Sequence, residues 1–384
     1  MFDCIVVGGG PAGSSAAYHL AKAGHDVLIL EAAALPRYKP CSGAVSPSVA
    51  DWFDFDFEPA IDGKVRRVRY SWKLGDTINA ELETDPIWTV RRDVFDQFLL
   101  ERAVEKGAAL RDRTAVRSIE FLSADTDRSD GKCCWQVSVA GEVLLARYLV
   151  AADGANGPMA DWLGFRSHKT RTAGVLEIPV DAGVENGAFC FEFGLVKNGC
   201  IWSFPKPQGY SMGVSSFIGG SLKDLETPLR QYASDFDVSF EQGELHTHPL
   251  KLWDGNCDLH FRQAIVVGEA AAIVDPLTAE GIRPALYSGM KGAQAISSAL
   301  QGDLDALANY TKTMHESWGS DMQWAQRIAS VFFRLPKIGY RVGIKRPTAT
   351  KRLGQILAGE VSYADIANRV IKRISTSFIP GIGK

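Results

Sequence analysis

Residues 3–13 read DCIVVGGGPAG, and residues 25–31 read HDVLILE. The first stretch is a short apolar strand that enters a glycine turn, and the small residues 14–23 after it predict a helix. Gly8 permits the tight turn, Gly10 lets the backbone approach a pyrophosphate, and Gly13 lets the helix pack closely on the strand. Since the helix N-terminus offers free N–H groups and a positive dipole end, the unit predicts a dinucleotide site.

Glu31 stands at the end of the second strand. A carboxylate in this position accepts hydrogen bonds from the hydroxyls of an adenosine ribose, and it favours FAD or NAD over NADP. Pro11, Ala12 and Ala32 flank these positions and are predicted to contact the same cofactor. A glycine-rich turn without a ligand is the alternative, which the surrounding strand, helix and acid disfavour.

Two later apolar runs also end in small or polar turns. Residues 147–152 run into Asp153, and residues 264–267 run into Gly268 and Glu269. Ligands of open α/β sheets bind at the carboxyl ends of the strands, so we expect these turns to converge on the glycine turn. A cofactor that is reached from three such distant segments is long, which favours FAD over NAD.

The composition is that of an ordinary globular protein. The chain of 384 residues has a net charge of −3, which gives no reason to expect nucleic acid as a partner. Its seven cysteines form no CxxC pair, its first residues show no basic leader, and no apolar run is long enough to span a bilayer. We therefore expect a cytoplasmic protein. The sequence makes no prediction of the oligomeric state.

The charge is distributed unevenly along the chain. Residues 322–384 hold 12 Lys and Arg against two acids, a net charge of +10, so the remaining residues carry −13. Apolar side chains alternate with these cations, and a basic amphipathic surface of this kind favours peripheral contact with an anionic membrane. A helical cap whose charges face water or the acidic body is the open alternative.

Four further motifs follow along the chain. They read PRYKPCSG at 36–43, VRRDVFD at 90–96, DG at 153–154 and GEAAAIVDPLTAEGI at 268–282. With these motifs the chain resembles the geranylgeranyl reductase family, within the para-hydroxybenzoate hydroxylase-like flavoproteins. The resemblance implies an α/β fold with a Rossmann-like, GR2-type FAD-binding domain, interleaved with an antiparallel-sheet substrate domain and followed by a C-terminal helical segment. The implied boundaries are 1–60, 90–165 and 255–300 for the FAD-binding domain, 61–89 and 166–254 for the substrate domain, and 301–384 for the helical segment.

The resemblance also implies which residues hold FAD. Outside the glycine turn they are Arg37, Cys41, Ser42, Gly43, Arg92, Asp153, Gly268, Glu269, Ala279, Gly281 and Ile282. Three of them depart from the family pattern, because Ser42 and Ala279 replace glycines and Glu269 replaces an aspartate. Glutamate keeps the chemistry of the carboxylate but moves it by one methylene.

A strand motif carries the implied substrate contacts. GCIWSFP at 199–205 resembles the family's Tyr-x-Trp-x-Phe-Pro strand, with Cys200 at the tyrosine position. The resemblance implies that Trp202, Phe204 and Pro205 contact the substrate, whereas plain core packing of these side chains is equally open. The period of two along a strand places Trp202 and Phe204 on one face.

Cys41 and Tyr38 are the candidate catalytic residues. A thiol beside the flavin is able to donate or relay a proton, although a small hydrophobic residue in a tight loop is the other interpretation of Cys41. A helix is predicted from about Ile282 to Leu300, and Glu280 in the turn before it is expected to cap or orient rather than to donate. The histidines of HTH at 246–248 and the cysteine pair at 133–134 are assigned to structure or surface, and no metal site is predicted, because no further ligands stand near them.

The function that the resemblance implies is saturation of C=C bonds in a polyprenyl chain, with a hydride from reduced FAD and a proton. A second glycine turn of the right context is absent from the sequence, so NADPH that docks transiently, or reduced ferredoxin, is the expected electron donor. Two alternatives stay open. One is an FAD-dependent monooxygenase of an aromatic or lipid substrate, and the other is a prenyl-lipid carrier without catalysis.

Overall fold

The glycine turn lies at the centre of the first sheet. The computed structural model describes residues 1–123, 133–180 and 187–367. The strands of the first sheet are β1 (Phe2–Val7), β2 (Val27–Leu30), β8 (Ala109–Arg111), β9 (Ser118–Leu122), β10 (Cys134–Val139), β11 (Glu142–Ala151), β17 (His260–Phe261) and β18 (Ala264–Val266). The order β18-β11-β1-β2-β8 is parallel throughout, while β17, β10 and β9 add antiparallel pairs. The continuous apolar runs of β1, β2 and β18 are expected for parallel strands that are covered on both faces.

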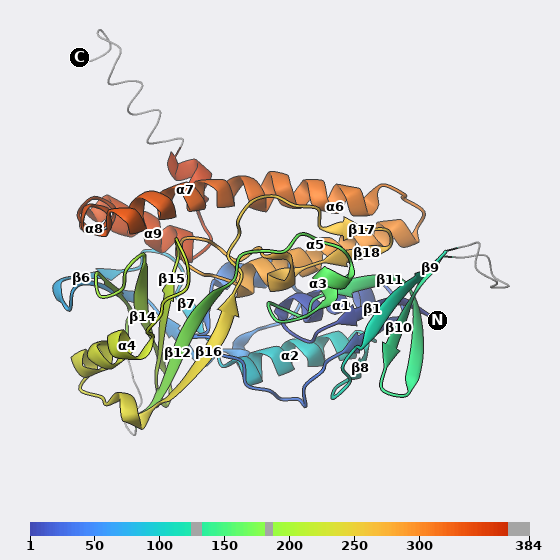
Figure 1. Ribbon diagram of the computed structural model, residues 1–384, viewed down its shortest axis with the longest axis horizontal. Helices are drawn as coiled ribbons and strands as arrows, with labels where there is room; N and C mark the ends of the chain where they lie inside the picture. Colours follow the sequence, from blue (N-terminus) through green and yellow to red (C-terminus); the bar gives the residue numbers. More distant parts are fainter. Residues whose placement is uncertain (124–132, 181–186, 368–384) are drawn as a thin grey trace, which may run out of the picture.

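Helices cover this sheet closely at the glycine turn (Figure 1). They are α1 (Pro11–Lys22), α2 (Arg92–Glu105), α3 (Met159–Trp162) and α5 (Ile282–Leu300). A Cβ atom on Gly13 would lie 1.9 Å from the carbonyl oxygen of Gly8, and one on Gly289 would lie 2.2 Å from that of Ala12. Helix α1 therefore touches β1 on one side and α5 on the other through backbone atoms, and only glycine fits at these two contacts.

The second sheet is formed from two distant parts of the chain. Its order is β16 (Glu244–Leu250), β12 (Arg171–Pro179), β15 (Gly209–Ser216), β14 (Gly199–Lys206), β13 (Phe189–Phe193), β5 (Arg67–Trp72) and β6 (Gly75–Glu81). Neighbouring strands are antiparallel except β13 and β5, which are parallel and join the two parts of the chain. The short helix α4 (Glu226–Ala233) packs on this sheet, and a small third sheet joins β3 (Ala44–Val45), β7 (Ile87–Thr89) and β4 (Gly63–Val65).

The C-terminal helices run along one side of the molecule, from the first sheet to the second (Figure 1). They are α6 (Ala306–Met314), α7 (Ser320–Arg334), α8 (Pro336–Gly343) and α9 (Pro347–Leu357). Phe333 of α7 stacks on Phe217 of the second sheet with ring centroids 4.8 Å apart, and Phe332 meets Phe193 edge-on at 5.2 Å. These aromatic contacts attach the helices to the face of the second sheet that looks toward the first.

The fold class predicted from the sequence is confirmed, with differences at the ends of elements. Helix α1 begins at Pro11 rather than Ser14, because a proline suits the first helical turn, where its missing N–H is not needed. The helix predicted from Ile282 to Leu300 is α5. The end of the basic segment, residues 368–384, lies outside the described residues. Among the residues that the structure describes, no helix has both the length and the apolar character to cross a membrane.

Candidate active site

A cavity of about 570 Å³ joins the edge of the first sheet to the face of the second. Gly10, Pro11, Ala12, Ala152 and Gly154 line one end, beside the carboxyl ends of β1 and β11. The other end is lined by aromatic and aliphatic side chains of the second sheet and of α7–α9. The polar end and the apolar end therefore belong to one continuous space.

The polar end has the geometry of a nucleotide cradle. One oxygen of the Glu31 carboxylate accepts a hydrogen bond from the N–H of Gly9 at 2.9 Å, and the other accepts one from Ala33 at 2.9 Å. The atom that a Cβ on Gly10 would meet first is Nη2 of Arg37, at 3.6 Å. The chain thus leaves open, at the start of α1, the space that a pyrophosphate needs to reach backbone N–H groups, and these residues fit an FAD. Ala32 is exposed beside Glu31.

A buried ion-pair cluster supports this cradle. Arg92, which lines the cavity, donates from Nε and Nη2 to the two carboxylate oxygens of Asp96 at 2.7 and 2.6 Å. Arg37 donates to the same carboxylate at 3.0 Å and lies 3.3 Å from Glu31. Asp96 is 1% exposed, and its carboxylate holds the cations of both Arg92 and Arg37 near the cavity. Asp96 was not among the predicted site residues, although its spacing of four residues from Arg92 on a helix was the available signal.

Glu269 lies at the middle of the cavity wall. Nε2 of His248 is 3.0 Å from its carboxylate, Nζ of Lys39 is 3.6 Å away, and the N–H of Lys251 donates at 3.3 Å. Burial opposes ionisation of Glu269, but the hydrogen bond from His248 and the charge of Lys39 outweigh it and hold its pKa below the ordinary value. His248 also lines the cavity, a position that the sequence pattern did not indicate.

Asp153 lies behind the cavity wall. Its two neighbours Ala152 and Gly154 line the cavity, while its own carboxylate accepts a hydrogen bond from the N–H of Met159 at 2.9 Å, at the start of α3. Gly157 packs against this side chain so closely that a Cβ would lie 2.0 Å from its Cγ. Burial raises the pKa of Asp153 to about 6.

The raised pKa of Asp153 predicts how stability depends on pH. Between the ordinary pKa of 3.8 and about 6, the folded state keeps a proton that the unfolded state has lost, so the free energy of unfolding falls as pH rises. Asp153→Asn removes this cost and still offers an oxygen to Met159. At neutral pH we expect it to stabilise the flavin-free protein by about 1–2 kcal/mol, with almost no effect below pH ~4.

Urea unfolding at the two pH values measures this difference. Asp161→Asn changes an exposed acid on α3, the helix that follows Asp153, and is expected to shift the free energy of unfolding by no more than about 0.5 kcal/mol. An Asp153→Asn protein with the same pH dependence as the wild type would contradict the prediction.

The turn before α5 brings a second acid to the cavity. Ala279 adopts a left-handed backbone with φ of 59°, which explains why the family pattern has glycine there. The Glu280 carboxylate forms a two-pronged pair with Arg283, whose Nε and Nη2 lie 2.9 and 2.8 Å from its oxygens. Glu280 thus orients a cation, in keeping with its expected role, and Gly281 and Ile282 line the cavity where α5 begins.

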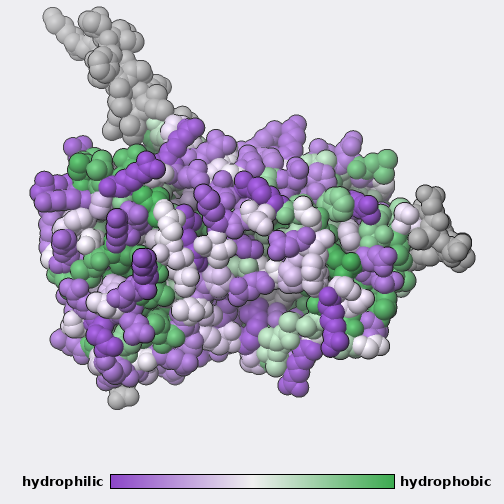
Figure 2. All heavy atoms as spheres, viewed as in Figure 1, coloured by the Kyte–Doolittle hydropathy of each residue, from purple (hydrophilic) through white to green (hydrophobic). Residues whose placement is uncertain are grey.

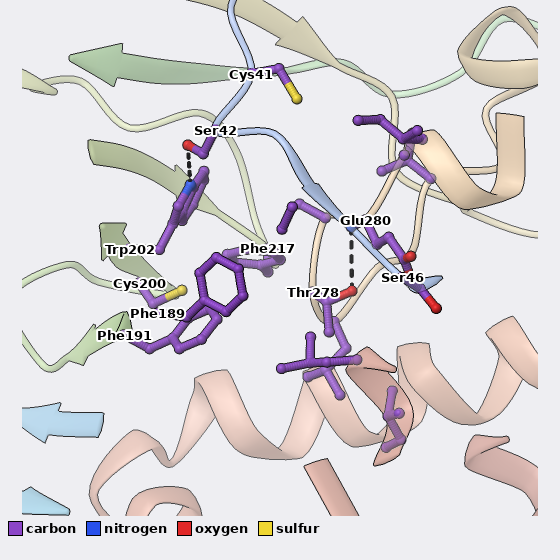
Figure 3. Close-up of a pocket in the computed structure, with 18 of the residues that line it drawn as sticks. Cys41, Ser42, Ser46, Phe189, Phe191, Cys200, Trp202, Phe217, Thr278 and Glu280 are labelled. Carbon is purple, nitrogen blue, oxygen red and sulfur yellow. Dashed lines mark hydrogen bonds between the residues drawn. The ribbon is translucent and has the colours of Figure 1, made fainter. Parts of the chain in front are cut away.

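The Cys41 loop and the second sheet meet at the cavity (Figure 3). Cys41, Ser42 and Gly43 all line it, and Nε1 of Trp202 donates to Oγ of Ser42 at 2.8 Å. The serine that replaces a family glycine is therefore tied to the strand motif. Tyr38 is 50% exposed outside the cavity, where its hydroxyl lies 3.4 Å from the carboxylate of Glu177.

The apolar wall is wider than the sequence motif suggested. Cys200, Trp202 and Phe204 alternate along β14 and line the cavity, whereas Pro205 lies on the opposite face of the strand by the same alternation. The other lining side chains were not predicted, although the alternating FCFEF of β13 and the aromatic pair of α7 were signals for them. They include Phe189, Phe191, Phe193, Phe217, Phe332, Phe333 and Ile344.

The comparison with known proteins agrees with this architecture. The model of a family described as "FAD binding domain" matches residues 1–195. The chain belongs to this family. Gly8, Gly10, Gly13, Glu31, Arg92 and Asp153 lie within the matched residues. The protein is thus an FAD-dependent oxidoreductase, as the glycine turn and its partners predicted.

Curated relatives carry reductase names. The geranylgeranyl diphosphate reductase of Rhodobacter capsulatus is 29% identical over 318 residues, which cover 78% of this chain and 76% of the relative. Digeranylgeranylglycerophospholipid reductase 1 of Methanopyrus kandleri is 26% identical over 389 residues, which cover 93% of this chain and 96% of the relative. The solved structure of a geranylgeranyl bacteriochlorophyll reductase-like protein from Thermoplasma acidophilum shares the fold. Its TM-score is 0.75 at 21% identity, and the match covers 98% of this chain and 96% of that protein. The resemblance drawn from the sequence motifs is confirmed.

Proposed function

We propose that this oxidoreductase saturates C=C bonds of a polyprenyl chain. The observation that carries the proposal is the continuity of the cavity, whose nucleotide cradle opens directly onto an apolar wall of aromatic side chains. Bound reduced FAD supplies a hydride when it is held in such a cradle. An isolated double bond has no polar group to anchor it, so its position depends on shape and on exclusion of water.

The residues of the chain divide this work between them. Gly10 and the start of α1 accommodate the pyrophosphate, while Glu31 is placed for the ribose. Arg92 is the cation at the cavity wall, and Asp96 fixes its orientation. The side chains of the second sheet and α7 form a dry channel that suits an isoprenoid chain. The electron donor in this proposal is NADPH that docks transiently, or reduced ferredoxin.

Anaerobic single-turnover kinetics test the proposed function. The flavin of the purified protein is reduced with dithionite, and geranylgeranyl diphosphate or a geranylgeranylated glycerol lipid is then added without oxygen. Return of the oxidised flavin absorbance, together with a product two hydrogens heavier by mass spectrometry, is the expected result. No reoxidation by any geranylgeranyl compound would overturn the proposal.

The same experiment separates the two alternatives. A monooxygenase leaves the polyprenyl probe unchanged and forms a product only after oxygen is admitted. A carrier without catalysis purifies with no yellow flavin and still retains a prenyl lipid, which mass spectrometry of the purified protein detects.

We also propose that the protein contacts an anionic membrane through α7 and α8, from the cytoplasmic side. Val331, Leu335, Ile338 and Val342 are between 51% and 66% exposed. The cations Arg334, Lys337 and Arg341 stand among them and are exposed as well. Figure 2 shows hydrophobic and hydrophilic atoms side by side at this end of the molecule. Ile328, Phe332 and Phe333 of α7 line the cavity, so a membrane on the outer side of α7 and α8 would lie next to the apolar channel.

Replacing Leu335 and Ile338 together by glutamate tests the membrane contact. Each change removes an apolar contact and adds a charge that the bilayer surface repels, so we expect affinity for phosphatidylglycerol vesicles to fall at least about tenfold. Co-sedimentation at physiological salt measures it. Leu304→Glu is the matched control, because this leucine is 97% exposed but lies away from the basic helices. A wild-type protein that stays wholly in the supernatant with these vesicles would contradict the proposed membrane contact.

A further inference from the structure

A chain of hydrogen bonds leads from the cavity wall to the surface of the second sheet. It starts at Oγ of Ser42, which lines the cavity and is 3.3 Å from Oγ of Ser211 on β15. Ser211 lies 2.9 Å from the carboxylate of Glu177 on the neighbouring strand β12. The same carboxylate oxygen lies 3.4 Å from the hydroxyl of Tyr38, a half-exposed side chain. Ser211 is fully buried, so a dry segment connects the cavity with water.

Trp202 fixes the direction of this chain. An indole N–H is able only to donate, so Ser42 must accept at 2.8 Å from Trp202. When Glu177 is protonated it donates to Ser211, and Ser211 donates to Ser42. Both acceptor positions of the Ser42 hydroxyl are then used, and its own hydrogen is left for the cavity. Figure 3 shows Ser42 and Trp202 joined in this way, with the thiol of Cys41 on a separate side of the loop.

We propose that Glu177, Ser211 and Ser42 form a relay that delivers the proton for saturation of the double bond. The proposal rests on the proposed function. One alkene carbon gains the hydride that the reduced cofactor supplies, and the other gains the Ser42 proton as the π bond breaks. Ser42 regains a proton from Ser211, Ser211 from Glu177, and the Glu177 carboxylate from water at the edge of the sheet. Ser42 is the donor that touches the substrate, while Glu177 and Ser211 act through it.

The charges around Glu177 suit a group that holds a proton and then gives it up. Burial raises its pKa, while Lys206, Ser211, Tyr38 and His246 lower it in part. Glu244, its direct partner on β16, adds a negative charge near Tyr38. The acid thus stays protonated to higher pH than an ordinary glutamate, and Lys206 favours the carboxylate that remains after transfer. Cys41 differs, because its thiol lies beside the buried cation Arg92 instead.

Substitutions along the relay test it in the flavin-loaded protein. Glu177→Gln and Ser211→Ala are expected to slow single-turnover reoxidation by geranylgeranyl diphosphate at least about 100-fold, because a positioned acid contributes on that order. The wild-type rate should fall as pH rises through the pKa of Glu177, whereas the Glu177→Gln rate should not. The controls are Glu244→Gln, an exposed acid opposite Glu177, and Ser203→Ala, a buried hydroxyl without a hydrogen-bond partner in the described chain. Neither should change the rate.

A spectroscopic readout in the flavin-free protein separates the relay from a merely structural role. Infrared difference spectra of the wild type should show a carboxylic acid band that titrates above the range of ordinary glutamates and is absent from Glu177→Gln. Relay variants that keep the wild-type rate and pH profile would overturn the relay and leave the proposed function intact. A wild-type protein that no geranylgeranyl compound reoxidises would overturn both. If Cys41→Ser alone abolishes the pH dependence, the thiol and not Glu177 is the source.

Discussion

The Gly13→Ala variant is expected to purify without flavin and to unfold more readily than the wild type. The Cβ would lie 1.9 Å from the carbonyl oxygen of Gly8, a backbone atom that cannot rotate away. Helix α1 must therefore move off β1, which displaces the whole cradle at its N-terminus. We expect the free energy of unfolding to fall by about 3 kcal/mol, the upper end of the range for an overpacked core, and the flavin absorbance to be absent. Urea unfolding and the visible spectrum measure the two effects.

Gly10→Ala separates loss of the cofactor from loss of the fold. Gly10 has an extended backbone with φ of −81°, and its Cβ would meet only the end of the Arg37 side chain, at 3.6 Å. The flavin-free variant should therefore be as stable as the wild type, within about 0.5 kcal/mol. Its methyl group nevertheless fills the space for the pyrophosphate, so flavin affinity should fall at least about tenfold. If Gly13→Ala retains flavin while Gly10→Ala does not, the proposed packing of α1 on β1 is wrong.

Asp96→Ala is the second change with a large expected effect. It leaves the buried guanidinium of Arg92 without its partner and removes one of the acids that hold Arg37. An uncompensated buried charge costs about 3–5 kcal/mol, so the flavin-free protein should lose that much of its free energy of unfolding in urea. Flavin content should also drop, since Arg92 is no longer oriented toward the cavity.

Two further variants check the reason for this loss. Asp93→Ala removes an acid from the first turn of the same helix, where only the dipole is affected, and should cost at most about 1 kcal/mol. Adding Arg92→Met to Asp96→Ala removes the unpaired cation and should recover part of the stability, though not the flavin. A double variant that is less stable than Asp96→Ala would show that the charge of Arg92 is not the cause.

The nucleotide end was predictable because its signals are local. A strand, a glycine turn, a helix and an acid follow one another within residues 3–31, and each is set by backbone sterics or by hydrogen bonding of near neighbours. The turn at Gly268 and the start of α5 were likewise readable, since a glycine and a helix start leave their own sequence marks. Each of these positions remains a candidate FAD contact, whereas the membership of the chain in the FAD-binding family is shown.

The rest of the site depends on which distant elements become neighbours. His248 sits on an edge strand whose sequence resembles any half-exposed strand, and only the approach of the Gly268 turn brings Glu269 to it. The partnership of Ser42 with Trp202 joins the Cys41 loop to a strand of the second sheet, and the residue types alone gave no hint of it. The lining supplied by α7 was taken as part of a basic amphipathic tail, because periodicity does not tell whether the apolar face of a helix meets a core, a membrane or a ligand.

The cavity wall that α7–α9 contribute has a consequence for how such enzymes diversify. The cradle is made by residues of the first sheet and its helices, whereas much of the channel comes from separate helices late in the chain. Mutations in those helices can lengthen, narrow or bend the channel while the parts that bind the nucleotide keep their sequence. Selection for a substrate of different size or shape is therefore free to act on these helices, while the residues of the nucleotide cradle stay unchanged.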